Sequence, residues 1–331
     1  MADIARLIIR TPNWLGDAVM ALPAMAAVRR GFADRTLLIA APKSIAPIFS
    51  ETTDVAPDEV LSIDSAREVE QLRAARADAI IVLRNSFGSA WTAKRAGIAE
   101  RWGYRGSGRG VLLTRGVARP RRLHQVEYYN TLARELGFDV AADARPGLTA
   151  SDRSLERAAA LLIAAGAALD RPLVGFAPGA AYGHAKQWPP ERVVQVIAGL
   201  AEAGVGAVLV GARDDRDAAR AIESTLPKGA TVANLVGRTT LGELVGVVAR
   251  CAAFVSNDSG AMHIAAALGV PLTAIFGPTD ERVTAPAGVA DVILRPVFCR
   301  PCMLRECPID HRCMKRIDVD SVLHSVMRRL A

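Results

Sequence analysis

Short apolar runs alternate with helical patterns along the whole chain, an alternation typical of parallel α/β folds. In the first half, strands are predicted at 7–9, 37–40 and 79–83, and helices at 18–30 and 68–75. The second series has predicted strands at 173–177, 207–210, 253–255, 272–276 and 292–294. Its helices are predicted at 191–203, 215–226, 241–250 and 262–268. Pro23 is expected to kink the first helix.

A polar stretch rich in Pro and Gly, 139–152, separates the two series, and an alanine-rich helix is predicted at 154–165. The length of 331 residues suits two domains. We predict one domain over 1–165 and another over 166–331, with 319–331 as a closing helix. Two open α/β sheets are expected to face each other across a cleft. Ligands should bind beyond the carboxyl ends of their strands.

The net charge of +7 and pI of about 9.5 favour a polyanionic partner such as a phosphorylated substrate or an anionic membrane face. Aromatic residues make up only 5% of the chain, which argues against a nucleic-acid partner bound by base stacking. No apolar run has transmembrane length, and the first ten residues are predicted to form a strand rather than a signal peptide. We therefore expect a cytoplasmic protein.

Basic residues are concentrated in the segment 94–122, which holds nine of them and one acid, Glu100. Glycines are interleaved with these charges, so the segment is predicted to be rich in loops. A charge run is most often a solvated surface. Its nearly single sign favours a face that attracts anions.

The segment 251–268 is predicted to be a strand, a tight polar turn and a helix N-terminus. Free backbone N–H groups and the positive end of the helix dipole make such a turn an anion site. Asp258 or Ser259 can cap the helix, and Gly260 lets a ligand approach the backbone closely. The alternative is that these polar residues serve only as a cap.

Three other loops follow predicted strands. In 11–17, Gly16 permits the turn, and Asp17 is either a helix cap or a general base, of which its spacing favours the cap. In 178–188, Lys186 is either a solvated lysine or a point charge suited to phosphate. In 211–217, Asp215 is either an ordinary helix-start acid or an acceptor for a ribose diol. The glycine fingerprints of dinucleotide dehydrogenases and P-loop ATPases are absent from the sequence.

Four cysteines fall in one short segment: Cys299, Cys302, Cys307 and Cys313. At this density, cysteines of a cytosolic protein suggest a metal more than disulfides, with His311 as an alternative ligand. Their spacing is not that of a standard zinc ribbon. The segment is therefore either a structural zinc site or a reduced, partly buried lid over the cleft.

Together these loops resemble the bacterial ADP-heptose–lipopolysaccharide heptosyltransferases, and within them the type II enzymes. The resemblance spans nearly the whole chain. It rests on Asn13-Trp14-Leu15-Gly16-Asp17 with Leu22-Pro23, on Pro178-Gly179 with Lys186-Gln187-Trp188-Pro189, on Ser256 to His263, and on the cysteine-bearing stretch 299–313. The last of these points to type II.

The resemblance implies a GT-B architecture of two Rossmann-like domains, with the acceptor site in the first and the nucleotide-sugar site in the second. It implies inverting transfer of L-glycero-D-manno-heptose from ADP-heptose to heptose I of the lipopolysaccharide inner core. No cofactor is required, and no Asp-x-Asp motif stands in a matching loop. The basic segment would meet core and lipid A phosphates, which places the enzyme at the inner face of the inner membrane.

The resemblance also implies roles for single residues. Asp17 matches the catalytic base, Lys186 a lysine that contacts the donor phosphates, and Asp215 is the candidate ribose partner. The donor loop matches Asp258, Ser259, Gly260, Ala261, Met262 and His263. Ala180 and Ala181 stand where relatives have a hydroxyl residue, so one phosphate contact is missing. The alternatives are another heptosyltransferase type, an inverting GT-B enzyme with a different donor, and a non-catalytic module that binds nucleotide sugars.

Overall fold

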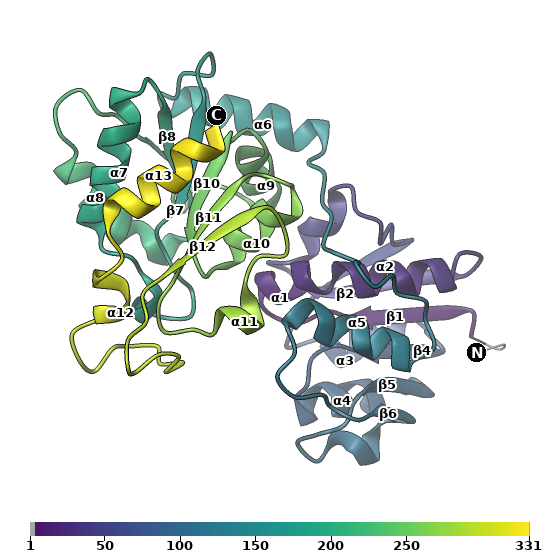
Figure 1. Cartoon of the computed structure of the whole chain (residues 1–331). Helices are drawn as coiled ribbons and strands as arrows, with labels where there is room; N and C mark the ends of the chain where they lie inside the picture. Colours follow the sequence, from purple (N-terminus) through teal and green to yellow (C-terminus); the bar gives the residue numbers. More distant parts are fainter. Residues whose placement is uncertain (1–3, 331) are drawn as a thin grey trace. The chain divides into compact units, whose positions relative to one another are not determined.

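The computed structural model describes residues 4–330 (Figure 1). The chain divides into two compact units, the first ending at Gly147 and the second beginning at Leu148. Helix α6 (Asp152–Ala164) packs against α9 (Leu241–Ala249), where a Cβ on Gly246 would lie 2.1 Å from the Ser154 carbonyl oxygen. This close helix contact places α6 in the second unit, so the division falls before the helix. The sequence placed it after the helix, at residue 165.

The first unit contains a parallel six-stranded sheet with the order β3-β2-β1-β4-β5-β6. Its strands are β1 (Arg6–Arg10), β2 (Thr36–Pro42), β3 (Glu59–Ile63), β4 (Ala79–Val82), β5 (Glu100–Tyr104) and β6 (Arg115–Val117). Its helices are α1 (Leu15–Met20), α2 (Leu22–Gly31), α3 (Glu68–Ala74), α4 (Phe87–Arg95) and α5 (Gln125–Glu135). Helices α1 and α2 pack against α5, and α3 packs against α4.

Three strands of this sheet and two of its helices are missing from the sequence prediction. The segment 94–122 contains β5, β6 and a 3-10 turn, η2 (Arg109–Leu112), so the expectation that it is rich in loops is wrong over much of its length. Strand β3 lies at the sheet edge and is largely exposed, which removes the apolar run by which a strand is recognised. The predicted helix 18–30 is split at Ala21, and Pro23 lies in the first turn of α2, which agrees with the expected kink.

The second unit has its own parallel six-stranded sheet, with the order β12-β11-β10-β7-β8-β9. Its strands are β7 (Leu173–Ala177), β8 (Gly206–Leu209), β9 (Ala233–Asn234), β10 (Ala253–Asn257), β11 (Leu272–Phe276) and β12 (Ala290–Leu294). Its remaining helices are α7 (Pro190–Glu202), α8 (Arg216–Thr225), α10 (Gly260–Ala267), α11 (Glu281–Thr284), α12 (Arg312–Lys315) and α13 (Val319–Leu330). The α/β class and every strand predicted for this unit are confirmed.

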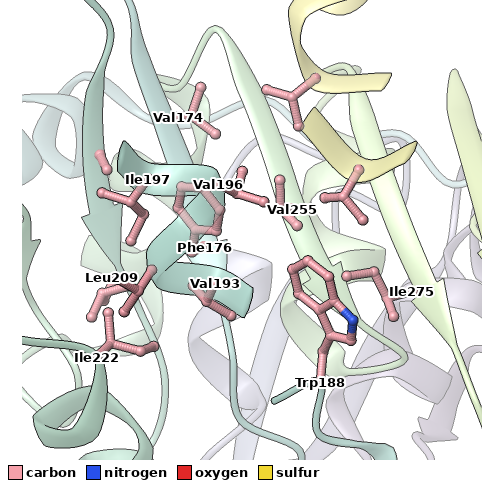
Figure 2. Close-up of a cluster of buried hydrophobic side chains, with 14 of the residues drawn as sticks. Val174, Phe176, Trp188, Val193, Val196, Ile197, Leu209, Ile222, Val255 and Ile275 are labelled. Atoms are coloured by element: carbon pink, nitrogen blue, oxygen red, sulfur yellow. The ribbon is translucent and has the colours of Figure 1, made fainter. Parts of the chain in front are cut away.

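One core cluster of the second unit lies between the sheet and the helices α7, α8 and α13 (Figure 2). Phe176 of β7, Val196 of α7 and Val322 of α13 are fully or almost fully buried in it. Trp188 is buried at its edge and donates from its indole nitrogen to the Ile317 carbonyl over 3.3 Å. Helix α13, predicted as a closing helix, thus completes this core. Within residues 4–330, no helix is long and apolar enough to cross a membrane.

Candidate functional site

Three of the loops selected from the sequence emerge from neighbouring strands. Strand β7 lies between β10 and β8, and all three are parallel. Their carboxyl ends therefore share one sheet edge, which is where open α/β sheets bind ligands. We call the loops 178–188, 211–217 and 257–263 the edge loops. The sheet order, rather than nearness in sequence, brings them together.

A buried ion pair joins two edge loops. The Lys186 Nζ atom lies 2.7 Å from Oδ2 of Asp258, and the two side chains are only 12% and 7% exposed. Lys186 also lies 4.8 Å from the ring centroid of Tyr182. A buried charge has to be paired, so each member of this pair holds the other in place. The predicted phosphate lysine is thus fixed at the sheet edge beside the loop that precedes α10.

Asn257 ties the same two loops through its side chain. Its Oδ1 atom accepts a hydrogen bond from the Trp188 backbone N–H over 3.2 Å, and its Nδ2 atom donates to the Pro178 carbonyl over 2.6 Å. Asn257 is buried, so these bonds are made away from water. The sequence motif contains Asn257, but nothing in the sequence shows that its amide spans the other loop.

The N-terminus of α10 is formed as predicted. Ser259 is the N-cap, and its Oγ atom accepts from the Met262 backbone N–H at 3.5 Å. Gly260 and Ala261 make the first turn of the helix and are partly exposed, whereas His263 is buried. Ser259 therefore supplies the cap, and Asp258 supplies the partner of Lys186.

Asp215 lies at the end of a short 3-10 turn, η4 (Arg213–Asp215), and its carboxylate faces the first edge loop. Oδ2 accepts from the backbone N–H of Ala212 over 2.8 Å, and a Cβ on Gly179 would lie 1.9 Å from this carboxylate. Burial raises the pKa of Asp215, and its backbone hydrogen bonds to Ala212 and Ala180 oppose that rise. Asp215 thus connects two edge loops, and its predicted contact with a ribose stays a prediction.

The cysteine segment, residues 297–313, is docked on the first edge loop. The Ala185 backbone N–H donates to the Arg305 carbonyl over 2.9 Å, and the Tyr182 hydroxyl donates to the Met303 carbonyl over 2.8 Å. At the other end of the segment, Arg300 donates to the Gly277 carbonyl beyond β11 over 2.8 Å. The segment therefore crosses the sheet edge from the loop after β11 to the loop after β7.

The thiols of this segment are all free; Cys313 is buried and the other three are half-buried. Burial, followed by the charges of Cys299, Cys307 and Cys302, raises the pKa of Cys313. Over residues 4–330, no three His, Cys, Asp or Glu side chains are arranged so that they could hold a metal ion. The geometry therefore gives the zinc alternative no support, and a lid over the cleft stays a prediction.

In the first unit, Asp17 lies inside the first turn of α1 and is half-buried. The N-cap residue is Trp14, whose side chain makes no capping hydrogen bond, and Asp17 is the acid of the first turn, where it interacts favourably with the helix dipole. Its role as a general base stays a prediction. The Asp17 carboxylate lies near Tyr129 of α5: burial first, and then the charge of Asp17, raises the pKa of that tyrosine.

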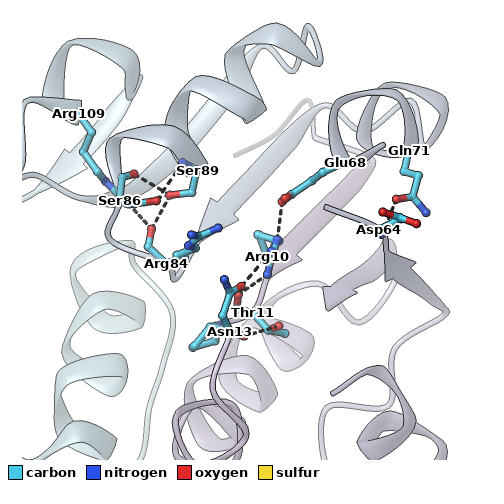
Figure 3. A network of polar contacts seen from close by, with 11 residues as sticks. Arg10, Thr11, Asn13, Asp64, Glu68, Gln71, Arg84, Ser86, Ser89 and Arg109 are labelled. Carbon is cyan, nitrogen blue, oxygen red and sulfur yellow. Dashed lines mark hydrogen bonds and ion pairs between the residues drawn. The ribbon is translucent and has the colours of Figure 1, made fainter. Parts of the chain in front are cut away.

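Arg10 fixes the loop that leads to Asp17 (Figure 3). Its side chain is buried, pairs with Glu68 of α3 at 2.6 Å and donates to the Thr11 carbonyl at 2.7 Å and to Asn13 Oδ1 at 3.1 Å. The sequence analysis missed both members of this pair. An arginine at the end of a buried strand indicates that an acidic partner is nearby in space. The sequence could not show which acid this is, because Glu68 is 58 positions away.

Two parallel α/β sheets, one of which carries a paired cation and a helix N-terminus at its carboxyl edge, define a class of proteins that bind anionic ligands such as nucleotides. The model of glycosyltransferase family 9 (heptosyltransferase) matches residues 66–312, more than half of the chain. The chain therefore belongs to this family, and it is a glycosyltransferase, as the sequence predicted.

Curated relatives and a solved structure agree with this assignment. The chain is 31% identical to lipooligosaccharide heptosyltransferase 2 of Haemophilus ducreyi, over 88% of each chain. It is 32% identical to lipopolysaccharide heptosyltransferase 2 of Escherichia coli K12, over 85% of each. The solved structure of the E. coli ADP-heptose lipopolysaccharide heptosyltransferase II is 29% identical, covers 98% of both chains and superposes with a TM-score of 0.84. The GT-B fold and the type II resemblance predicted from the sequence are confirmed.

Proposed function

We propose that this enzyme transfers L-glycero-D-manno-heptose from ADP-heptose to heptose I of the lipopolysaccharide inner core, with inversion at the anomeric carbon. Membership of the family and the names of the relatives support the sugar and the acceptor. The observation that carries the proposal is the pairing of Lys186 with Asp258 beside the N-terminus of α10. A fixed cation and free helix N–H groups suit the diphosphate of a nucleotide sugar.

The donor half of the mechanism rests on the second unit. When the bond between C1 of the heptose and the phosphate oxygen breaks, negative charge grows on the leaving ADP. Lys186 and the first N–H groups of α10 are already oriented at this edge, so they stabilise that charge without reorganising. We expect the backbone N–H groups of Gly260 and Ala261, in the first turn of the helix, to bind phosphate oxygens.

The acceptor half rests on Asp17 of the first unit. Its carboxylate takes the proton of the acceptor hydroxyl as that oxygen forms its bond to C1, on the face opposite the departing ADP. The proton ends on Asp17, the new glycosidic bond replaces the bond to phosphate, and ADP leaves with the bonding electrons. A positioned general base contributes roughly 10²- to 10⁴-fold to such a step. The bonds from Arg10 hold the loop before Asp17 in place.

We also infer that the first unit contacts an anionic membrane surface peripherally. On α4, Phe87 and Trp91 are exposed with ring centroids 6.4 Å apart, and Lys94 lies over the Trp91 ring. Val111 of the adjoining η2 turn is 86% exposed. Exposed basic residues of the same segment are Lys94, Arg95, Arg105, Arg119, Arg121 and Arg122. Aromatic and aliphatic side chains beside such charges match the interface of an anionic bilayer.

Transfer is tested with purified protein, ADP-heptose and a core acceptor that ends at heptose I. We expect a heptosylated product, and Asp17→Asn should lower kcat by about 10²- to 10⁴-fold while ADP affinity stays unchanged. Asp34→Asn, an exposed carboxylate of the same unit, is the matched control. If a product forms only with another nucleotide sugar, the transferred sugar is not heptose and the proposal has to change accordingly. Binding without turnover would identify a non-catalytic module.

Membrane contact is tested by sedimentation with vesicles of phosphatidylglycerol and of phosphatidylcholine. We expect binding to the anionic vesicles only, and a marked loss in the double variant F87S/W91S. Ile163→Ser removes a more exposed apolar side chain from the second unit and should change nothing. Equal binding of the double variant and the wild type would refute this surface.

A further inference from the structure

The proposed donor site has a charge deficit within the residues already assigned to it. Lys186 is paired with Asp258 at 2.7 Å in a buried position, so the two side chains together carry almost no net charge. The N-terminus of α10 adds about half a positive charge. A diphosphate carries more negative charge than this, and its charge grows on departure. A further cation at the same edge would correct the balance.

Arg305 of the cysteine segment is such a cation. Its Cζ atom lies 5.2 Å from the ring centroid of Tyr182, the same ring that Lys186 contacts at 4.8 Å. Arg305 is exposed, and no carboxylate of residues 4–330 forms an ion pair with it. Asp258 already neutralises Lys186, so Arg305 is the cation beside this ring whose charge is available to an anionic ligand.

Hydrogen bonds to the first edge loop fix the backbone around Arg305, so the Cα atom from which its side chain extends has a defined position. The Arg305 carbonyl accepts from Ala185 over 2.9 Å, and the Tyr182 hydroxyl donates to the Met303 carbonyl over 2.8 Å. His311 Nε2 is 2.7 Å from the Ala185 carbonyl. Gly183 allows this docking, because a Cβ there would lie 2.4 Å from the Arg305 carbonyl oxygen. The cysteine segment thus presents Arg305 to the loop that holds Lys186.

We propose that Arg305 binds the diphosphate of the donor together with Lys186, with the Tyr182 ring as the support that both cations share. This inference rests on the proposed function, because it takes the ligand to be a nucleoside diphosphate sugar. A planar guanidinium donates two parallel hydrogen bonds to one phosphate group, which an ammonium does not do. The cysteine segment then has a direct role in donor binding, which its thiols alone do not explain.

The test compares ADP with AMP, because only ADP carries the diphosphate. Binding of each nucleotide, and of inorganic pyrophosphate, is measured by calorimetry for the wild type, Arg305→Ala, Arg305→Lys and the control Arg316→Ala, which removes an exposed arginine of the same unit. We expect Arg305→Ala to weaken ADP and pyrophosphate by about 10- to 100-fold and AMP by much less. Arg305→Lys should recover part of the loss.

The outcomes separate this inference from the proposed function. A wild type that transfers heptose, together with an Arg305→Ala variant of unchanged ADP affinity, refutes the role of Arg305 alone. Equal losses for ADP and AMP in Arg305→Ala also refute it, since they indicate a distorted loop instead of a lost phosphate contact. A wild type that neither transfers heptose nor binds ADP refutes the proposed function, whereas a pyrophosphate loss in Arg305→Ala would still support the anion site.

Discussion

Substitution of Lys186 should affect stability and nucleotide binding separately, and the ion pair with Asp258 allows the two to be distinguished. In Lys186→Met, the Asp258 carboxylate stays almost fully buried and loses its partner. Removal of one member of a buried pair costs about 3–5 kcal/mol. For a unit of this size, that corresponds to a melting temperature lower by roughly 6–20 °C. If Lys186 were instead a solvated lysine, its substitution would hardly change the free energy of unfolding.

The double variant K186M/D258N removes both charges. Neutral replacement of a whole buried pair is often close to neutral for stability, so most of the lost melting temperature should return. ADP affinity should not return, because the cation that meets the phosphates is still missing. We expect ADP binding to remain about 10- to 100-fold weaker than in the wild type.

Calorimetry of unfolding and of ADP binding measures both quantities on the same samples. The chain has two compact units, so the transition of the second unit has to be resolved from that of the first. Lys315→Met, which removes an exposed lysine of the second unit, is the control and should behave as the wild type. The reasoning is refuted if Lys186→Met melts with the wild type, or if the double variant binds ADP normally.

Two further substitutions or labels address the cysteine segment and the core. Gly183→Ala should lower the melting temperature of the second unit and weaken ADP binding in calorimetry. The reason is that the new Cβ would lie 2.4 Å from the Arg305 carbonyl oxygen, at a backbone φ of 155°. Gly88→Ala, where there is space for a Cβ, is the control, and equal behaviour of the two variants would contradict the docking of the cysteine segment. Iodoacetamide should label Cys307 in the native protein but leave Cys251 unlabelled, because Cys251 is buried and burial raises its pKa to about 12. Peptide mass spectrometry measures the labelling of both thiols. Rapid labelling of Cys251 in the native protein would contradict its burial.

The second unit was predictable from sequence because its central strands are buried on both faces. Strands β7, β10 and β11 are continuous apolar runs followed directly by turns and helices, which is the pattern that sequence reading detects best. The first unit was harder because its sheet ends in strands of mixed polarity. Strand β5 contains charged Glu100 and Arg101 beside buried Trp102, so neither alternation nor an apolar run marks it.

The sequence identified individual site residues, but it did not identify the residues to which they bond. Lys186 and Asp258 each stood out by position after a strand, and yet their bond joins residues 72 positions apart. The basic segment shows the opposite error, because Arg109 was counted with the surface charges. It is fully buried, donates to the Tyr104 and Val82 carbonyls, and burial lowers its pKa to about 10. Composition reports charge, whereas burial depends on the whole fold.

The loop after β7 takes its shape largely from other segments of the chain. Asp215 holds its start, Asn257 bonds it at Pro178 and Trp188, and the cysteine segment bonds it at Ala185. Lys186 is therefore positioned by residues from three separate parts of the second unit. A substitution of Asn257 should reduce nucleotide affinity through Lys186 without touching the nucleotide, and the loss should shrink when Lys186 is already absent. Additive losses would mean instead that Asn257 contacts the ligand itself.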